Sequence, residues 1–124
     1  MPAKTKILII EDEEMLSNMY KVKFENEGFE VETALNGADG LELAAKEMPS
    51  IILLDIIMPK IDGFAVLQKL KADPKTKDIP VILLTNLGQD EDVTRGKQLG
   101  AVGYLVKANH TPSEVVDKVR GFIK

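Results

Sequence analysis

Cysteine and tryptophan are absent from this chain of 124 residues, and histidine occurs once, as His110. Without cysteine the chain can form no disulfide, no thiolate metal site and no cysteine nucleophile. A single histidine excludes a metal site built from several imidazoles and argues against a Ser-His-Asp triad. His110 lies just before the predicted start of the last helix, and we interpret it as a solvent-exposed loop residue.

Aromatic residues and positive charge are also scarce. The chain has two Tyr and four Phe, and its 16 Lys and Arg against 20 Asp and Glu give a net charge of −4. An acidic domain with few aromatics is a poor candidate for a nucleic-acid surface. The 44% hydrophobic and 29% charged residues are typical of a globular fold.

Long apolar segments are missing as well. Every apolar run is far shorter than the roughly 20 residues that cross a bilayer, and the N-terminal segment is too short for a signal-peptide core. We therefore expect a soluble, cytoplasmic protein that does not bind membranes. The length suits one domain over residues 1–124.

Five short apolar segments recur along the chain and predict strands. Several are apolar throughout, which is typical of strands buried on both faces of a parallel sheet. They are Ile7–Ile10, Val31–Ala34, Ile51–Leu54, Val81–Leu84 and Gly103–Val106.

Helical periodicity fills the segments between and after these strands. The apolar positions are Leu16, Met19, Tyr20 and Phe24 for the first helix; Leu41, Ala44, Ala45 and Met48 for the second; Val66, Leu67 and Leu70 for the third; and Val115, Val116, Val119, Phe122 and Ile123 for the fifth. The fourth helix, roughly 91–99, has a weak apolar face. Strict alternation of strand and helix predicts an α/β fold of the doubly wound (βα)5 type with one parallel sheet.

Chemically useful side chains follow four of the predicted strands. Glu11 and Asp12 follow the first strand and Asp55 the third, while Thr85 follows the fourth and Lys107 the fifth. In an open α/β sheet, ligands bind outside the carboxyl ends of the strands. We therefore expect these five side chains to form one site.

The composition of this candidate site indicates phosphoryl chemistry. Carboxylates without cysteine or several histidines suit a hard cation, best Mg²⁺, with Mn²⁺ as an alternative, and Mg²⁺ readily accepts a phosphoryl oxygen. Lys107 and Thr85 offer a charge and a hydroxyl to such oxygens. Asp55 is the carboxylate placed to act as a nucleophile, so the expected product is an aspartyl phosphate. Glycine-rich dinucleotide and P-loop motifs are absent from the turn after the first strand.

Four segments in this order and spacing resemble the receiver domain of bacterial response regulators: ILIIEDEEM, LLDIIMPKIDG, VILLTN and GYLVKA. The resemblance implies a CheY-like, flavodoxin-like fold with strand order 2-1-3-4-5. It implies that Asp55 is the phosphoacceptor and that Lys107 contacts the phosphoryl group. It further implies that Thr85 and Tyr104 are switch residues, and that the metal is held by Glu11, Asp12, Asp55 and the backbone carbonyl of Ile57. No other cofactor is implied.

Two departures from the family pattern carry their own predictions. Ala108 follows Lys107 where the family usually has a proline with a cis bond, and a cis bond before alanine costs about 2.5–4 kcal/mol, which favours trans. Asn86 stands where small residues are common, so it would add a polar contact or crowd the site.

Ile57 and Leu87 each lie two residues after a site residue and cannot orient an attacking water, so we predict a long-lived aspartyl phosphate.

The resemblance also implies partners. A histidine kinase or histidine phosphotransfer protein would donate the phosphoryl group, and a downstream protein would bind the face formed by the fourth helix, fifth strand and fifth helix. We expect a monomer or a weak phosphorylation-dependent dimer. We also expect a stand-alone receiver without an output domain, which does not turn over free substrates as an enzyme. Three alternatives remain: a binding module that no longer uses phosphorylation, the receiver part of a longer DNA-binding regulator, and a metal-dependent phosphatase.

Overall fold

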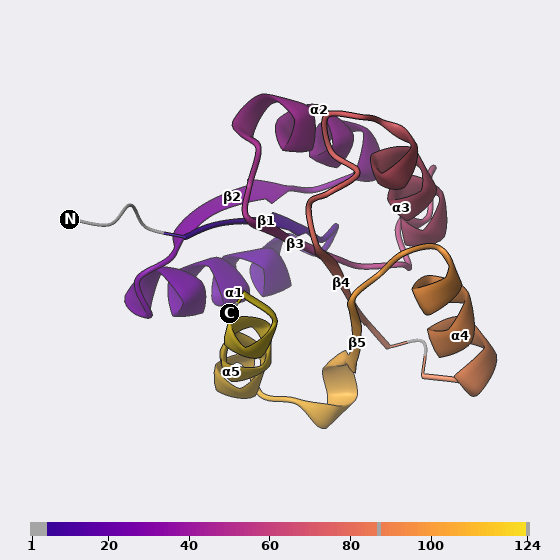
Figure 1. Ribbon diagram of the computed structural model, residues 1–124. Coiled ribbons are helices and arrows are strands. Elements are labelled where there is room, and N and C mark those ends of the chain that lie inside the picture. The colour runs from indigo at the N-terminus through magenta and orange to yellow at the C-terminus, as the bar shows by residue number, and fades with distance from the viewer. Residues whose placement is uncertain (1–4, 87, 124) are drawn as a thin grey trace.

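A five-stranded parallel sheet forms the centre of the structure, a computed structural model that describes residues 5–86 and 88–123 (Figure 1). Its order is β2-β1-β3-β4-β5 and every neighbouring pair is parallel, as predicted. The strands are β1 (Lys6–Ile10), β2 (Glu30–Ala34), β3 (Ile51–Leu54), β4 (Val81–Thr85) and β5 (Gly103–Val106). Each predicted strand is therefore confirmed to within a residue at either end.

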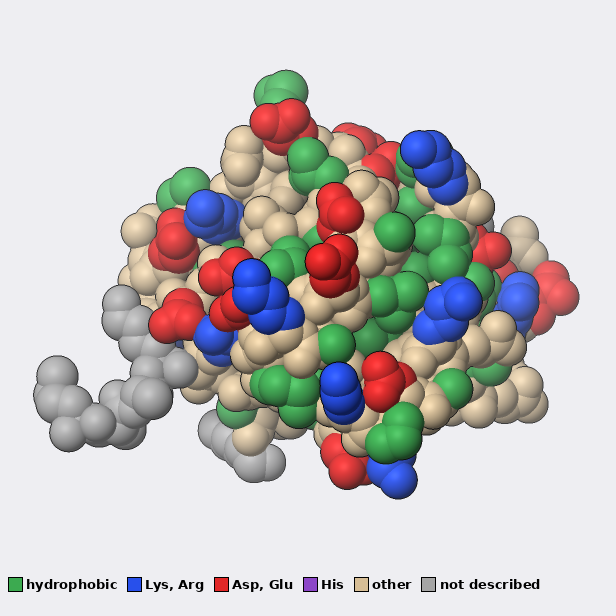
Figure 2. All heavy atoms as spheres, turned by 90° about the horizontal axis from the view of Figure 1, so that it is seen from above, with side chains coloured by type: hydrophobic (Ala, Val, Ile, Leu, Met, Phe, Trp, Pro, Cys, Tyr) green, Lys and Arg blue, Asp and Glu red, His purple; other side chains and the backbone are tan. Residues whose placement is uncertain are grey.

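The helices cover both faces of the sheet. They are α1 (Glu14–Asn26), α2 (Gly37–Glu47), α3 (Gly63–Ala72), α4 (Asp90–Gln98) and α5 (Pro112–Ile123), with a short 3₁₀ turn η1 (Lys107–Asn109) before α5. In Figure 1, α1 and α5 lie on one face and α2 and α3 on the other, with α4 beside β5. Figure 2 looks down on the molecule from above, where acidic and basic side chains are interspersed rather than gathered by sign. No helix among the described residues is both long and apolar enough to cross a membrane.

Alternate residues of the buried strands build two separate cores. Ile7 and Ile9 of β1 join a cluster with Tyr20 and Phe24 of α1 and the valines of α5. Leu8 and Ile10 point to the opposite face, toward a cluster that includes residues of α2 and α3. Because both faces are covered, both sets of strand side chains are apolar, which explains why the sequence shows continuous runs instead of alternation.

Local signals end and begin the helices largely as the sequence predicts. Gly28, after α1, has a φ of +95°, which favours glycine. At α5, the Glu114 N–H donates to Thr111 Oγ1 at 3.2 Å and the Thr111 N–H donates to Glu114 Oε1 at 2.8 Å. This reciprocal pair is the predicted capping box.

Three apolar residues predicted to lie on buried helix faces are largely exposed, so those assignments are wrong. Met19 is 51% exposed because the buried face of α1 is formed by Ser17, Tyr20 and Phe24. Met48 is 53% exposed and adopts a left-handed conformation after the last residue of α2. Phe122 is 40% exposed, although its ring packs over Gly103 on edge strand β5. Helix α4 is as weakly buried as its sequence predicts, with Gly96 as its buried residue.

Candidate functional site

The register of the sheet brings the predicted site residues to one edge. Ile10 pairs with Leu54, so Glu11 and Asp55 leave the sheet side by side, and the Asp55 N–H donates to the Ile10 carbonyl at 3.0 Å. Thr85 pairs with Val106 in the β4–β5 ladder, so Lys107 follows β5 at the same edge. Parallel pairing therefore places these side chains together without any long loop.

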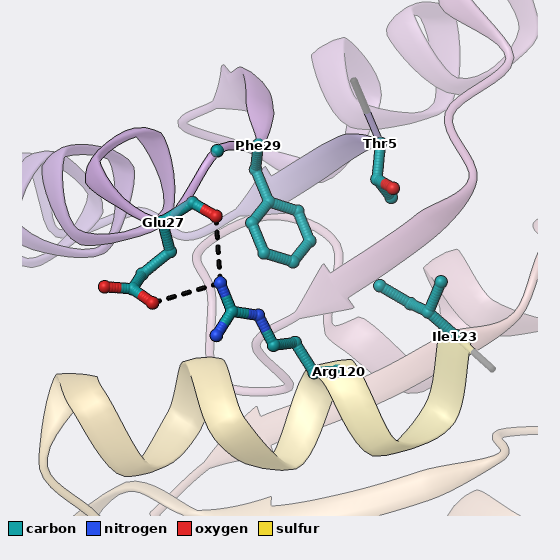
Figure 3. Close-up of a pocket in the computed structure, with 6 residues that line it drawn as sticks. Thr5, Glu27, Phe29, Arg120 and Ile123 are labelled. Carbon is teal, nitrogen blue, oxygen red and sulfur yellow. Dashed lines mark hydrogen bonds and ion pairs between the residues drawn. The ribbon is translucent and has the colours of Figure 1, made fainter. Parts of the chain in front are cut away.

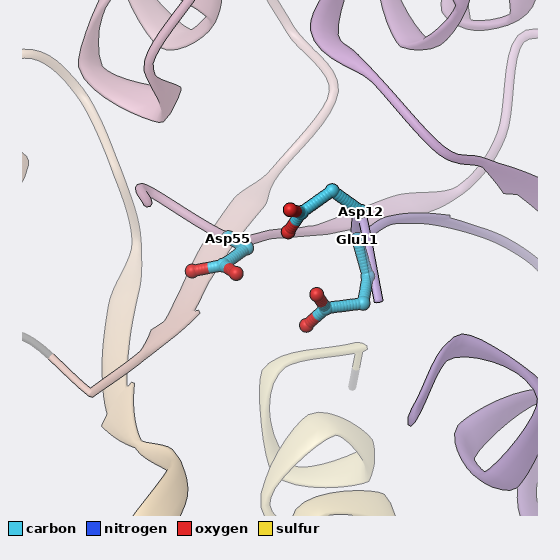
Figure 4. Close-up of side chains that lie close together, drawn as sticks. All are labelled: Glu11, Asp12 and Asp55. Atoms are coloured by element: carbon cyan, nitrogen blue, oxygen red, sulfur yellow. The ribbon is translucent and has the colours of Figure 1, made fainter. Parts of the chain in front are cut away.

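Three carboxylates lie close together there (Figure 4). One oxygen from each of Glu11, Asp12 and Asp55 lies within 4.8 Å of the others, with Glu11 and Asp55 buried and Asp12 half-buried. Burial raises the pKa of the Glu11 carboxyl, and the charge of Asp55 adds to that rise, while a hydrogen bond from Lys107 opposes it. Buried carboxylates this close repel one another unless a cation lies between them.

Lys107 supplies a cation to this cluster. Its Nζ donates to Asp55 Oδ2 at 3.0 Å and also to Glu11 Oε1. Burial alone would lower the pKa of the Lys107 ammonium, but the hydrogen bonds to Glu11 and Asp55 outweigh it and raise the pKa. The group is therefore a fixed positive charge beside two buried carboxylates.

The loop after β3 folds back against Asp55. The Ile57 N–H donates to Asp55 Oδ1 at 3.2 Å, and the Gly63 N–H donates to the Ile56 carbonyl at 2.8 Å. A Cβ on Gly63 would lie 2.3 Å from the Asp55 carbonyl oxygen, so a larger residue cannot approach the strand end this closely. Asp62 caps α3 by accepting the Ala65 N–H at 3.0 Å. The conformation of this loop thus depends on Gly63 and Asp62.

The two residues expected to act as a switch lie on adjacent strands. Thr85 is fully buried at the end of β4. Tyr104 of β5 is half-buried, and its ring lies 3.4 Å from where a Cβ on Gly96 of α4 would stand. Burial, with the charges of Asp92 and Asp55, raises the pKa of Tyr104 to about 12. Tyr104 therefore packs against α4 from a strand that neighbours the one carrying Thr85.

Several remaining expectations can be placed. Ile57 is 54% exposed beside Asp55, whereas Leu87 lies outside the described residues. No cis peptide bond occurs in 5–86 or 88–123, so the bond before Ala108 is trans as predicted. Asn86 adds a polar contact, since its Oδ1 accepts the Ala108 N–H at 3.1 Å.

Sequence reasoning missed the relation of Tyr20 to the site, because its periodicity marked it only as part of a buried helix face. Tyr20 is buried, and it lines a hollow of about 350 Å³ together with Lys107, Asn86 and His110. Burial raises the pKa of its phenol. The charge of Lys107 opposes this rise, whereas the charges of Glu11 and Asp55 add to it. A phenol within an otherwise apolar helix face was the signal that could have marked it.

A second hollow of about 300 Å³ lies at the opposite end of the strands (Figure 3). It is lined by residues that precede β1 and β2 and by the end of α5, including Phe29, Thr5 and Ile123. Arg120 there pairs with Glu27 at 3.0 Å and donates to the Glu27 carbonyl at 2.9 Å. Since these charges satisfy each other, the acidic edge is the better candidate site.

The donor set at the acidic edge fits a hard divalent cation. Carboxylate oxygens are the ligands that Mg²⁺ prefers, and three of them converge with no sulfur or imidazole group among them. A doubly wound sheet with acids after β1 and β3 and a lysine after β5 defines a class of phosphoryl-accepting α/β domains.

Comparison with known proteins identifies the family. The family model of the response regulator receiver domain matches residues 7–120, and the chain belongs to that family. The chain is 40% identical over 119 residues to the DNA-binding dual master transcriptional regulator RpaA of Synechocystis, covering 96% of this chain and 49% of that protein. It is 43% identical over 102 residues to the response regulator PleD of Caulobacter vibrioides, covering 82% of this chain and 22% of that protein.

Solved structures agree with this assignment. The chemotaxis protein CheY4 of Vibrio cholerae superposes with a TM-score of 0.90 at 29% identity, covering 96% of this chain and 98% of that one. A CheY-like receiver domain protein of Methanospirillum hungatei gives a TM-score of 0.88 at 27% identity, covering 98% and 94%. The chain is thus a phosphorylation-activated receiver of two-component signalling. It spans about half the length of the first curated relatives it matches, and the predicted stand-alone arrangement stays a prediction.

Proposed function

We propose that Asp55 is the residue that accepts the phosphoryl group, and that Lys107, Thr85 and the acids after β1 support the transfer. The observation that carries this proposal is the position of the Asp55 carboxylate, 5% exposed at the end of β3, with Lys107 Nζ 3.0 Å from its Oδ2. A buried carboxylate costs free energy unless a charge partner offsets it, and here the offsetting group is also suited to phosphoryl oxygens.

The transfer follows from this arrangement. One oxygen of the Asp55 carboxylate attacks the phosphorus of a phosphohistidine on the partner, and the bond from phosphorus to the imidazole nitrogen breaks. The phosphohistidine reacts with its other ring nitrogen protonated, so the imidazole leaves as a neutral ring when the electron pair of that bond stays on its nitrogen. Lys107, freed from Asp55, stabilises the charge on the phosphoryl oxygens. The protein therefore promotes its own phosphorylation without turning over a free substrate.

Glu11, Asp12 and Asp55, with the backbone carbonyl of Ile57, would hold Mg²⁺, for which Mn²⁺ could substitute. When bound, Mg²⁺ supplies positive charge to the transferring phosphoryl oxygens. Glu11 also accepts the Glu13 N–H through Oε2 at 3.0 Å, which fixes its carboxylate at the strand end. A fixed carboxylate loses little freedom on binding a cation.

Mass spectrometry of the intact protein tests this function. Acetyl phosphate and Mg²⁺ are expected to add the mass of one phosphoryl group to the wild type and none to Asp55→Asn, which keeps the shape of the side chain and removes the nucleophile. Asp62→Asn is the matched control, because Asp62 lies in the same loop but caps α3. A wild type that stays unmodified while a known receiver is modified beside it would overturn the proposal.

Phosphorylation would be read out on the α4–β5–α5 face. The Thr85 hydroxyl moves to contact the phosphoryl group, and Tyr104 turns into the space this releases. Gly96 is the buried residue of α4 and lies against the Tyr104 ring, so a change in that ring can shift the helix. A downstream protein would recognise this shifted face, and the partly exposed Val102 and Phe122 would add apolar contacts.

The phosphoryl donor would be a histidine kinase or histidine phosphotransfer protein docked over α1. Three large apolar side chains are exposed on that helix: Met15 at 84%, Met19 at 51% and Val22 at 54%. Met19 lines the hollow beside Lys107, and exposed apolar groups of this kind favour a protein partner. Met19→Glu is expected to slow transfer from the kinase and leave modification by acetyl phosphate unchanged.

Two alternatives are separated from this function by the same measurements. A binding module that no longer uses phosphorylation would show neither an adduct nor Mg²⁺ affinity, although every polar group needed for both is present. A phosphatase acting on free substrates would release phosphate with turnover. If the chain is part of a longer regulator, the α4–β5–α5 face would contact an output domain instead of a separate protein.

A further inference from the structure

A side-chain hydrogen bond joins the two loops that carry the residues expected to contact the phosphoryl group. Asn86 Oδ1 accepts the N–H of Ala108 at 3.1 Å. Asn86 directly follows Thr85 at the end of β4, and Ala108 directly follows Lys107 at the end of β5. The bond therefore spans the gap between the strand ends, one residue beyond each of the two groups expected to meet the phosphoryl oxygens.

The local backbone explains why this bond is available. A proline after Lys107 would carry no N–H, whereas Ala108 presents a donor, and the bond before it is trans. The turn η1 that begins at Lys107 is closed by a weak hydrogen bond, from the His110 N–H to the Lys107 carbonyl at 3.3 Å. The side-chain oxygen of Asn86 therefore adds a second hydrogen bond to a short turn whose own hydrogen bond is weak.

We propose that Asn86 is a positioning residue, whose side-chain oxygen holds the backbone after Lys107 so that the Lys107 ammonium reaches both Glu11 and Asp55. The inference rests on the proposed function of Asp55 and Lys107. The Lys107 side chain is 10% exposed and contacts two carboxylates at once, so a small shift of its backbone loses one of them. Asn86 itself is exposed and contributes little to the core, so it can be replaced without unfolding the protein.

Two substitutions at this position separate the hydrogen bond from simple crowding. Asn86→Leu keeps the branched bulk and removes the acceptor, while Asn86→Ala removes both. At saturating Mg²⁺ and acetyl phosphate, we expect both variants to accept the phosphoryl group about threefold to tenfold more slowly than the wild type. We also expect their Mg²⁺ affinities to stay within about twofold, because the carboxylates remain in place. Faster modification of Asn86→Ala than of the wild type would show that Asn86 only crowds the site, and would overturn the inference.

A double-mutant cycle tests whether Asn86 acts through Lys107. In a Lys107→Met background, Asn86→Leu should cause no further loss of rate, because the group that Asn86 positions is gone. A merely structural effect would persist in that background with the same fold-change, and that result would refute the proposal. Circular dichroism on all four proteins confirms that they are folded.

A third readout does not depend on phosphoryl transfer. In the unmodified protein, exchange of the Ala108 amide hydrogen is expected to be about fivefold faster in Asn86→Leu than in the wild type. Unchanged exchange at Ala108 would overturn this inference and leave the role of Asp55 untouched. A wild type that accepts no phosphoryl group would overturn the proposed function, while the exchange data would still report whether Asn86 anchors the Lys107 segment.

Discussion

Replacing Lys107 by methionine tests the electrostatic balance of the acidic site most directly. Methionine keeps the unbranched apolar stem and removes the ammonium that contacts Glu11 and Asp55. The Lys107, Glu11 and Asp55 side chains are 10%, 3% and 6% exposed, so the two carboxylates would lose a partner that water replaces poorly. At 3.0 Å, with an effective dielectric constant of about 20, one such pair gains about 5–6 kcal/mol before desolvation. Removing one member of a buried pair typically costs 3–5 kcal/mol, and we expect a loss near 3 kcal/mol at neutral pH without Mg²⁺.

The stability of Lys107→Met should depend on pH and on Mg²⁺ in a defined direction. Lys107 lowers the pKa of Glu11, so its removal raises that pKa further above the ordinary value of 4.5. A carboxyl with a raised folded-state pKa contributes stability that is lost as pH rises through that pKa. Lys107→Met should therefore regain part of its stability as pH falls from neutral toward the ordinary value of 4.5. Mg²⁺ at about 100 times its Kd should restore about 2.7 kcal/mol.

Urea unfolding followed by circular dichroism measures these effects. Lys118→Met, on the exposed face of α5, is the matched control and should change the free energy of unfolding by less than about 0.5 kcal/mol. The reasoning is refuted if Lys107→Met is as stable as the wild type at neutral pH without Mg²⁺. It is equally refuted if Lys107→Met gains no stability on acidification or on addition of Mg²⁺.

Three further predictions concern the surrounding residues. Gly63→Ala should destabilise the protein by about 2–3 kcal/mol in thermal or urea unfolding, because its Cβ would lie 2.3 Å from the Asp55 carbonyl oxygen; a neutral effect would contradict the close approach. Tyr104 should ionise at a pH of about 12 in an ultraviolet titration of a Tyr20→Phe variant, and its contribution to stability should be complete below 10.0 and lost as pH rises through 12. A midpoint near the ordinary value would show that the ring is not buried. Ile57→Asn should shorten the lifetime of the aspartyl phosphate by roughly tenfold, because an amide can orient the attacking water that isoleucine cannot; an unchanged phosphate release rate would argue against that role.

Much of the fold could be predicted because the apolar pattern follows directly from burial on both faces of a sheet. Runs such as Ile51–Leu54 have no polar face, so they fit a central parallel strand and little else. Helix ends with a local chemical signal, such as the capping box of Thr111 and Glu114, were also predictable. Met19 was misplaced because helical periodicity says which residues share a face and does not say how much of that face is covered. Met48 was misplaced because α2 ends one residue before it.

The candidate site was predictable in composition and only partly in geometry. The positions of Glu11, Asp55 and Lys107 after strands imply a common edge, since parallel strands end together. The sequence could not say that Lys107 contacts both carboxylates at once, nor that Tyr20 from α1 lies near them. Those contacts depend on how far side chains extend between helices and strands that lie far apart in the sequence.

By itself, then, the sequence determined the fold class, the family and the identity of the acidic, hydroxyl and ammonium groups, because these follow from local patterns of burial and from motifs at strand ends. The tertiary structure alone decided how those groups meet. It placed Lys107 between Glu11 and Asp55, and it joined Asn86 to Ala108 across two loops that are 22 residues apart in the chain. The physical reason is that a hydrogen bond or an ion pair depends on distances of a few ångströms, which only the packing of helices on the sheet can set.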